Sequence, residues 1–193
     1  MISAIILAAG RSKRMGQPKM LLPWGKITVI EQVITTFRAA GIGDILIVTG
    51  GAHAEVEKVI DPYRIRQVYN TDYADGEMLS SLQCGIGAMS EHVQAALVSL
   101  GDQPQLQEAS VLAICDAHRA NRSGLVVPSF QMRRGHPWLV ARSYWDEILS
   151  LKPPETTRDF LNRHAGEIQY VELDTPTILA DLDTPEDYRA SHP

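Results

Sequence analysis

Small, glycine and basic residues gather near the start of the sequence in a pattern that could bind a polyphosphate. The segment reads LAAGRSKRMGQPK from Leu7 to Lys19. Its small residues Ala8, Ala9 and Gly10 let a ligand lie against the backbone. Gly10 and Gly16 can also take positive φ, so that successive N–H groups point inward and form an anion nest. Positive charge comes from the remaining side chains: Arg11, Lys13, Arg14 and Lys19.

Two common phosphate motifs are absent from this segment. The P-loop requires GxxxxGK[ST], whereas here five residues separate Gly10 from Gly16 and no Lys-Ser pair follows. The dinucleotide fingerprint GxGxxG is also missing, which disfavours a Rossmann dinucleotide site. A surface loop whose charges are merely solvated is the alternative interpretation.

Carboxylates that could hold a metal follow later in the chain. Asp102 comes directly after the buried run Ala95–Leu100 and Gly101, which places it at the C-terminal end of a strand. Magnesium is usually held by one or two carboxylates together with substrate phosphates. The second carboxylate is expected at Asp181 or Asp183, and two residues at this spacing on a strand point the same way, so spacing does not choose between them.

Short apolar runs alternate with helical patterns, and these elements must bring the loop and the carboxylates together. Residues 29–40 recur at helical spacing, with Thr28 as N-cap and Gly41 as C-cap. The alternation predicts an α/β, Rossmann-like fold, a mostly parallel sheet with helices on both faces, in a single domain over 1–193. The expected strands are Ser3–Ala8, Asp44–Thr49, Ile65–Tyr69, Ala95–Leu100 and Leu125–Pro128, and further helices are expected at Ala54–Ile60, around Leu79–Met89 and through Val111–Cys115.

The pattern loosens after residue 130. Gln131–Pro137 is expected to be a polar loop and Trp138–Ala141 a strand, with short helices near Ser143–Leu149 and Thr157–His164. Glu167–Leu173 and Thr177–Leu182 are interpreted as two late strands, for which an antiparallel orientation to the others is the alternative to a parallel one. Thr184 is the expected N-cap of a last helix that has Pro185 at its first position.

Composition and charge exclude several classes of protein. The net charge is −5, which speaks against a general nucleic-acid binder. Residues 1–26 nevertheless carry +5 and no acid, while the remainder carries −10, which suggests a local anion site. The two cysteines lack CxxC spacing, so we expect buried free thiols. The first apolar run is too short to span a membrane and lacks a preceding basic region, so a cytoplasmic protein is expected.

The segment from Leu7 to Lys19 is similar to the signature LAAGxSxRMGxxK of nucleotidyltransferases, and within that group it resembles the molybdenum cofactor cytidylyltransferase family. Six ordered blocks continue the resemblance along nearly the whole chain. As a set they are specific, although no single block would be. The six blocks are Leu21–Pro23, Asn70–Met78, Ser80–Leu82 with Gly85, Gly101–Pro104, Gly135–Pro137 and Asp181–Tyr188.

The resemblance implies CTP as nucleotide, molybdopterin as acceptor, and Mg²⁺, or alternatively Mn²⁺, as cofactor. It assigns catalysis to Arg14, Lys19 and Asp102, and favours Asp183 over Asp181 as the second metal ligand. Nucleotide contacts would come from Leu7, Ala8, Ala9, Gly10, Arg11, Ser81 and Gly101, and acceptor contacts from Arg133, Arg134, Gly135 and His136. It further implies that Ala9, part of Leu-Ala-Ala-Gly rather than Leu-Ala-Gly-Gly, narrows the base site and favours a pyrimidine.

Other functions fit the same residues. One is a nucleotidyltransferase with another base or acceptor, such as GTP with molybdopterin or a sugar phosphate. Another is a non-catalytic factor that inserts cofactor into a molybdenum hydroxylase, and such a hydroxylase is also a possible recipient of the product. Two metal carboxylates favour turnover, because a binding module has less need of both. No nucleic-acid or membrane partner is expected.

Overall fold

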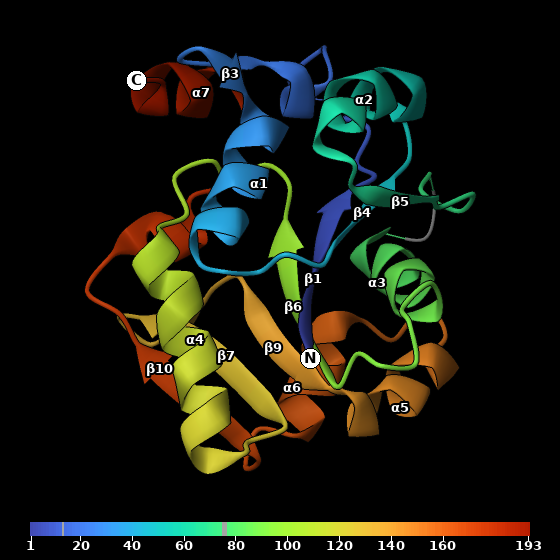
Figure 1. Ribbon diagram of the computed structural model, residues 1–193, viewed down its shortest axis with the longest axis vertical. Coiled ribbons are helices and arrows are strands. Elements are labelled where there is room, and N and C mark those ends of the chain that lie inside the picture. The colour runs from blue at the N-terminus through green and yellow to red at the C-terminus, as the bar shows by residue number, and fades with distance from the viewer. Residues whose placement is uncertain (13, 75–76) are drawn as a thin grey trace.

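The computed structural model describes residues 1–12, 14–74 and 77–193, and its centre is a mostly parallel β-sheet (Figure 1). The strand order is β10-β7-β9-β6-β1-β4-β5, and β8 pairs with β7. In chain order these strands are β1 (Ile2–Ala8), β4 (Ile45–Thr49), β5 (Arg66–Tyr69), β6 (Ala95–Leu100), β7 (Leu125–Phe130), β8 (Arg133–Arg134), β9 (Trp138–Ala141) and β10 (Ile168–Glu172).

Parallel pairing dominates this sheet. Strand β1 is parallel to both β4 and β6, β4 is parallel to β5, and β7 is parallel to β10. Only β8 and β9 run against their neighbours in the described part of the chain, since β9 is antiparallel to β6 and β7 and β8 is antiparallel to β7. Strands β1, β4, β6 and β7 therefore end at the same edge of the sheet. Parallel sheets of this kind open their ligand crevice at that edge.

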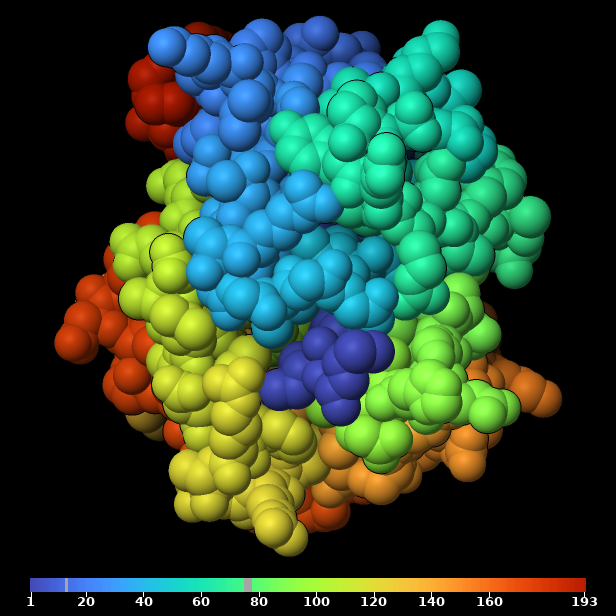
Figure 2. All heavy atoms as spheres, viewed as in Figure 1, coloured from blue at the N-terminus to red at the C-terminus, as the bar shows by residue number. Residues whose placement is uncertain are grey.

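Helices cover both faces of the sheet (Figure 1). In the space-filling view, the side chains of α1, α2 and α4 close over the near face (Figure 2). The helices are α1 (Val29–Ala39), α2 (His53–Ile60), α3 (Glu77–Gly87), α4 (Glu108–Asn121), α5 (Trp145–Ser150), α6 (Thr157–Arg163) and α7 (Pro185–Ser191). Short 3₁₀ helices occur at η1 (Lys19–Leu21), η2 (Asp61–Tyr63), η3 (Arg142–Tyr144) and η4 (Pro176–Leu179).

The alternation of side chains along β1 explains why the sheet is covered on both sides. Ile6 belongs to a core cluster with Phe37 of α1, while its neighbour Ile5 belongs to a second cluster with Leu82 of α3. Successive side chains of a strand point to opposite faces, so an uninterrupted apolar run needs apolar helices on each face. The predicted α/β fold is therefore confirmed.

Local signals in the sequence set several helix boundaries. Thr28 caps α1 in a reciprocal capping box with Glu31, and Gly41 follows the helix at φ +78°. Thr184 caps α7 in the same way with Asp187, and Pro185 is the first residue of that helix. Each box satisfies backbone N–H groups that would otherwise lack a partner. Both expected caps are confirmed.

The late strands were predicted incorrectly in two respects. Strand β10 (Ile168–Glu172) is parallel to β7, and the antiparallel strands are β8 and β9. The segment Thr177–Leu182 is not a strand, because η4 occupies its first half. Its apolar residues bury Ile178 against the sheet and Leu182 in a separate cluster, and two such anchors four residues apart resemble a strand in sequence alone.

The last segment of the chain packs against a small antiparallel sheet near the start, formed by β2 (Pro23–Trp24) and β3 (Ile27–Thr28). Leu182 is buried with Trp24 and Val29, and Tyr188 packs against them. The Tyr188 hydroxyl donates to the Pro23 carbonyl at 2.5 Å. This contact brings residues 181–188 back to the N-terminal loop.

Both cysteines are free thiols, as expected, but only Cys115 is buried, whereas Cys84 is partly exposed. None of the helices in residues 1–12, 14–74 and 77–193 is long and apolar enough to cross a membrane.

Candidate active site

The basic loop after β1 is held in shape by Ser12. Its carbonyl accepts from the backbone N–H groups of Met15 at 3.0 Å and Gly16 at 3.2 Å, and its hydroxyl accepts from the Lys19 N–H at 3.1 Å. Positive φ occurs at Ser12 (50°) and Gly16 (69°). The expectation of positive φ at Gly10 is wrong, because the turn is made at Ser12 instead. Lys13, expected to add charge here, lies outside the described residues.

Lys19 lies between two carboxylates. Its ammonium contacts the carboxylate of Asp102 and is 3.3 Å from that of Asp183. The side chains of Lys19 and Asp102 are only 13% and 9% exposed, so their charges interact with little screening by water. Burial by itself lowers the pKa of Lys19, but the charges of Asp102 and Asp183 outweigh it and raise that pKa above its ordinary value.

Arg14 completes this cluster from the solvent side. Its guanidinium donates to Asp183 at 2.9 Å, and its side chain is 69% exposed. An exposed pair of this kind contributes little to stability and is easily rearranged. Arg14 is therefore free to move to an incoming anion while Asp183 keeps its contact with Lys19.

The other candidate carboxylate, Asp181, has a different partner. Its carboxylate accepts from Gln103 Nε2 at 2.7 Å. Loss of solvent and the negative charge of Asp102 raise its pKa above the ordinary value. Asp183 contacts the Lys19 ammonium together with Asp102, whereas Asp181 interacts with Lys19 only through its charge. The geometry therefore favours Asp183 as the partner of Asp102.

A cavity of about 460 Å³ opens beside this cluster, above the ends of β1 and β6. A smaller hollow of about 290 Å³ adjoins it and shares Gly10, Arg14, Lys19 and Tyr73 with it. The larger cavity is lined by Leu7, Ala9, Gly10, Arg14, Lys19, Met20, Tyr73, Met78, Ser81, Leu100 and Asp102. Arg11 and Asp183 line the smaller hollow. Most of the expected catalytic and nucleotide residues are thus brought together.

Two expected nucleotide residues do not line these cavities. Ala8 is buried in the core cluster that faces α1, because it alternates with Leu7 and Ala9 along the chain. Gly101 serves packing: a Cβ there would come within 3.0 Å of Met20 Sδ and 3.2 Å of the Leu7 carbonyl oxygen. Ala8 and Gly101 therefore pack beneath the loop after β1 and do not face the cavities.

Ser81 is placed by a buried polar group that the sequence analysis did not single out. Asn70 donates to the hydroxyls of Ser80 and Ser81, each at 3.0 Å, and is itself only 4% exposed. Asn70 follows β5 and so ties the start of α3 to the sheet edge. The sequence signal was present, since Asn70 opens one of the six blocks. Gly76, which belongs to the same block, lies outside the described residues.

Tyr73 is a second residue that sequence analysis missed. The guanidinium of Arg11 lies over its ring, 5.5 Å from the centroid. Gly50 leaves room for this tyrosine, because a Cβ at Gly50 would come within 2.7 Å of Tyr73 Cβ. The aromatic ring therefore forms a fixed wall of both hollows.

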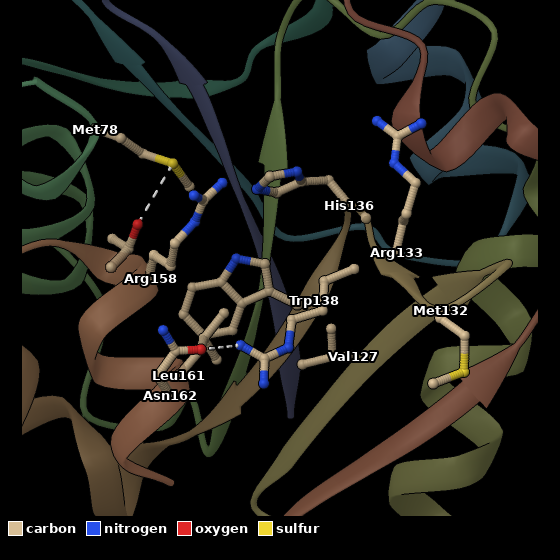
Figure 3. A pocket seen from close by; sticks show the side chains of 12 residues that line it. Met78, Val127, Met132, Arg133, His136, Trp138, Arg158, Leu161 and Asn162 are labelled. Atoms are coloured by element: carbon tan, nitrogen blue, oxygen red, sulfur yellow. Dashed lines mark hydrogen bonds between the residues drawn. The ribbon is translucent and has the colours of Figure 1, made fainter. Parts of the chain in front are cut away.

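A further cavity of about 490 Å³ lies beside the first and holds all four expected acceptor residues (Figure 3). Met78 lines both the 460 Å³ and the 490 Å³ cavities, so the two are neighbours. The lining consists of Met78, Val127, Met132, Arg133, Arg134, Gly135, His136, Trp138, Thr157, Arg158, Leu161 and Asn162. Thr157, Arg158 and Asn162, all on α6, were not anticipated.

Arg134 and His136 are held in this cavity in different ways. Arg134 donates to the Tyr170 hydroxyl at 3.0 and 2.7 Å and to Asn162 Oδ1 at 2.7 Å, and it also lies over the Tyr170 ring. His136 is fixed through its backbone N–H, which donates to the Ile178 carbonyl at 2.9 Å. Desolvation of the half-buried imidazole lowers the pKa of His136 to about 4. His136 is therefore a neutral hydrogen-bonding group at physiological pH.

The chemistry of the donors fits a hard divalent cation. Asp102 and Asp183 meet at one ammonium, so their oxygens converge on a single point. Three or more His, Cys, Asp or Glu side chains do not cluster into a metal site anywhere in the part of the chain that the structure describes. Two carboxylates beside a phosphate-sized basic hollow match the way proteins hold Mg²⁺, with substrate phosphates completing the shell.

The site combines a basic loop after the first strand of an open α/β sheet with two converging carboxylates and two adjoining cavities. These features suit an enzyme that transfers nucleotides, with an anionic ligand bound at the edge of the sheet. Residues 4–168 match the model of the MobA-like NTP transferase domain, and the chain belongs to this family.

Proteins similar to this chain have several names. The molybdenum cofactor cytidylyltransferase of Escherichia coli K12 is 30% identical over 97% of this chain and 93% of its own. The nicotine blue oxidoreductase of Paenarthrobacter nicotinovorans is 32% identical over 96% and 93%. The crystal structure of Rv0371c from Mycobacterium tuberculosis has a TM-score of 0.87 at 27% identity, covering 98% and 95%. A structure of Rv0371c in complex with manganese has a TM-score of 0.78, covering 99% and 97%.

Proposed function

We propose that this enzyme transfers CMP from CTP to the terminal phosphate of molybdopterin and releases pyrophosphate. The observation that carries this proposal is the convergence of Asp102 and Asp183 on Lys19, at the mouth of a cavity that shares Met78 with an arginine-lined neighbour. The likeness to the Escherichia coli molybdenum cofactor cytidylyltransferase supports the choice of substrates.

In this reaction the acceptor phosphate attacks the α-phosphorus of CTP, and the bond to the β-phosphate breaks. A phosphate monoester has its second pKa near 6, so it is already mostly a dianion at neutral pH and needs no general base. The task of the protein is to bring two anions together and to stabilise charge on the leaving group. Lys19 and Arg14 would hold the triphosphate, and both line its cavity.

Asp102 and Asp183 would hold Mg²⁺, with Mn²⁺ as an alternative. A bound divalent ion orients the phosphates and neutralises charge that develops on the leaving pyrophosphate. Lys19 would then exchange its carboxylate contacts for the phosphates, because its ammonium is within reach of both the carboxylates and the cavity.

Ala9 supports the choice of a pyrimidine base. Its methyl group lines the 460 Å³ cavity and is only 4% exposed, so it narrows the space above the loop. Arg133, Arg134, Gly135 and His136 would form the acceptor side, since all four line the 490 Å³ cavity. A molybdenum hydroxylase is the proposed recipient of the product.

One assay tests this function against its alternatives. Purified protein is incubated with Mg²⁺ and molybdopterin, and with CTP, GTP, ATP or UTP, and pyrophosphate release is measured. Release with CTP alone is the expected result. Release with GTP would show that the base was assigned incorrectly, and turnover only with a sugar phosphate would replace the acceptor. Absence of release with every nucleotide and acceptor would indicate a cofactor-insertion factor.

A further inference from the structure

Arg158 is a cation of the 490 Å³ cavity for which no role has yet been given. It is the second residue of α6 and lines the cavity together with Met78 and His136. Its guanidinium points toward Met78 and His136, whereas the guanidinium of Arg133 extends away from them (Figure 3). Of these two arginines, Arg158 is the one directed to the side of the cavity that adjoins the nucleotide.

The start of α6 is fixed by its own sequence. Thr156 accepts from the Asp159 N–H at 3.2 Å, and Asp159 accepts in return from the Thr156 N–H at 2.9 Å. Thr157 adds a tertiary contact, because its hydroxyl donates to Met78 Sδ at 3.7 Å. A capping box of this kind defines the first turn of a helix, so the backbone of Arg158 is held firmly against Met78.

Among the residues that the structure describes, none forms a hydrogen bond or an ion pair with the Arg158 guanidinium. Arg134, by contrast, has Tyr170 and Asn162 as partners. Among the described residues that line the cavity, none is acidic. The carboxylate of the next residue, Asp159, interacts with Arg158 through its charge but accepts its hydrogen bonds from Thr156. A guanidinium with five donors and no bonded carboxylate is suited to a bidentate contact with a phosphate.

The place of Arg158 within the 490 Å³ cavity indicates which part of the acceptor it would contact. Met78 belongs to the linings of both cavities, so the Met78 side of the acceptor cavity is the side next to the nucleotide. Arg134 lies farther along α6, where it donates to Asn162, one turn after Arg158, and to Tyr170 of β10. The group that must reach the α-phosphorus is the phosphate of the acceptor, and it therefore passes Arg158.

We propose that Arg158 binds the phosphate of the acceptor at the boundary between the two cavities and so determines that the acceptor is a phosphate monoester. This proposal rests on the nucleotidyl-transfer function given above. In this proposal α6 takes part in recognition of the acceptor phosphate. The capping box between Thr156 and Asp159 holds Arg158 in place for that contact.

Phenyl phosphate, a monoester with an aromatic body, serves as the probe, and binding is measured by calorimetry without nucleotide. Arg158→Gln is compared with the wild type, and Arg119→Gln is the charge-matched control, because Arg119 is exposed on α4 and paired with Asp116. We expect Kd for phenyl phosphate to rise at least tenfold in Arg158→Gln and to stay within twofold in Arg119→Gln. Kd for CTP should be the same in all three proteins.

A second measurement locates the contact. The ¹⁵N signal of Arg158 Nε, assigned by its absence in Arg158→Gln, should shift as phenyl phosphate is added. Equal affinity in wild type and Arg158→Gln, an unmoved Nε signal, or a wild type that does not bind the probe would each overturn the assignment. Binding of phenyl phosphate that depends on Arg158, in a protein that does not bind CTP, would support Arg158 and contradict cytidylyl transfer.

Discussion

Lys19 and Asp102 form an ion pair in which both side chains are largely shielded from water, 13% and 9% exposed. The pair joins the loop after β1 to the loop after β6, and so fixes the geometry of the crevice between two neighbouring strands. Breaking a buried pair by removing one partner typically costs about 3–5 kcal/mol, because the other charge is left uncompensated. Lys19 is spared part of that cost because Asp183 remains as a second partner.

Replacement of Asp102 by Asn should abolish metal-dependent turnover in a protein that still folds. We expect pyrophosphate release to fall about 100-fold or more, in the range found when a charge-stabilising group is removed from an active site. Lys19 keeps its contact with Asp183, and the Leu182 N–H keeps its bond to the Asp102 carbonyl, so the fold should persist. Far-UV circular dichroism checks folding. Near-normal turnover would contradict the assignment of Asp102 to the metal.

Replacement of Lys19 by Ala should weaken the binding of CTP. Loss of one cation from the triphosphate is expected to raise Kd about tenfold, equivalent to about 1.4 kcal/mol. The matched control is Lys26→Ala, because Lys26 is an exposed lysine in the same basic segment that lines neither nucleotide hollow. Calorimetry at fixed salt measures both. Equal loss in the two variants would indicate a general effect of charge rather than a contact.

Replacement of Gly135 by Ala should destabilise the acceptor cavity. A Cβ at this position would approach the Ile178 carbonyl oxygen to 2.5 Å, and that oxygen also accepts from His136. Overpacking of this kind costs about 1–3 kcal/mol. The control is Gly43→Ala, where a Cβ would meet nothing within 4 Å. Urea unfolding should separate the two variants, and equal stability would show that Gly135 is not required by its contact with η4.

Much of this molecule could be predicted from its sequence, since local chemistry determined it. Apolar runs and capping residues placed β1, β6 and α1, and the ends of these strands placed the basic loop and Asp102 at one crevice. The direct contact between Lys19 and Asp102 was not predicted. The choice between Asp181 and Asp183 as the second carboxylate needed tertiary contacts. On a strand, two residues at this spacing point to the same side, so the sequence could not distinguish them. Residues such as Tyr73 and Arg158 belong to no spacing pattern and are brought to the cavities only by the packing of Gly50 and α6.

The imidazole of His136 should remain neutral well below neutral pH. Desolvation of the half-buried ring lowers its pKa to about 4. In the unfolded chain the same group takes a proton near pH 6.5. Its contribution to stability is therefore complete above pH 6.5 and is lost as the pH falls toward 4. A histidine NMR titration measures the midpoint, and a value near 6.5 for His136 would contradict the desolvated environment.

His164 should have the opposite effect on stability. Its ring nitrogens lie 2.8 Å from Glu167 and 2.8 Å from Glu147, and the hydrogen bond to Glu167 is the main cause that raises its pKa above 6.5. The stabilisation is fully present below pH 6.5 and is lost as the pH rises through that raised pKa. His164→Gln should therefore lose more unfolding free energy relative to wild type at pH 5.5 than at pH 8.5. An equal difference at both pH values would contradict this pairing.

Residues 181–188 pack against residues near the start of the chain. This contact determines when, during synthesis, the site can be completed. Asp183 reaches Arg14 and Lys19 only because Leu182 and Tyr188 pack against Trp24 and the strand that contains it. A ribosome-bound chain that has emerged only through Asp102 already has the basic loop and the first carboxylate, but it lacks the second. With Asp183 in its proposed role as a metal ligand, partly made copies of this protein would not transfer nucleotides before the last segment of the chain has folded onto the basic loop.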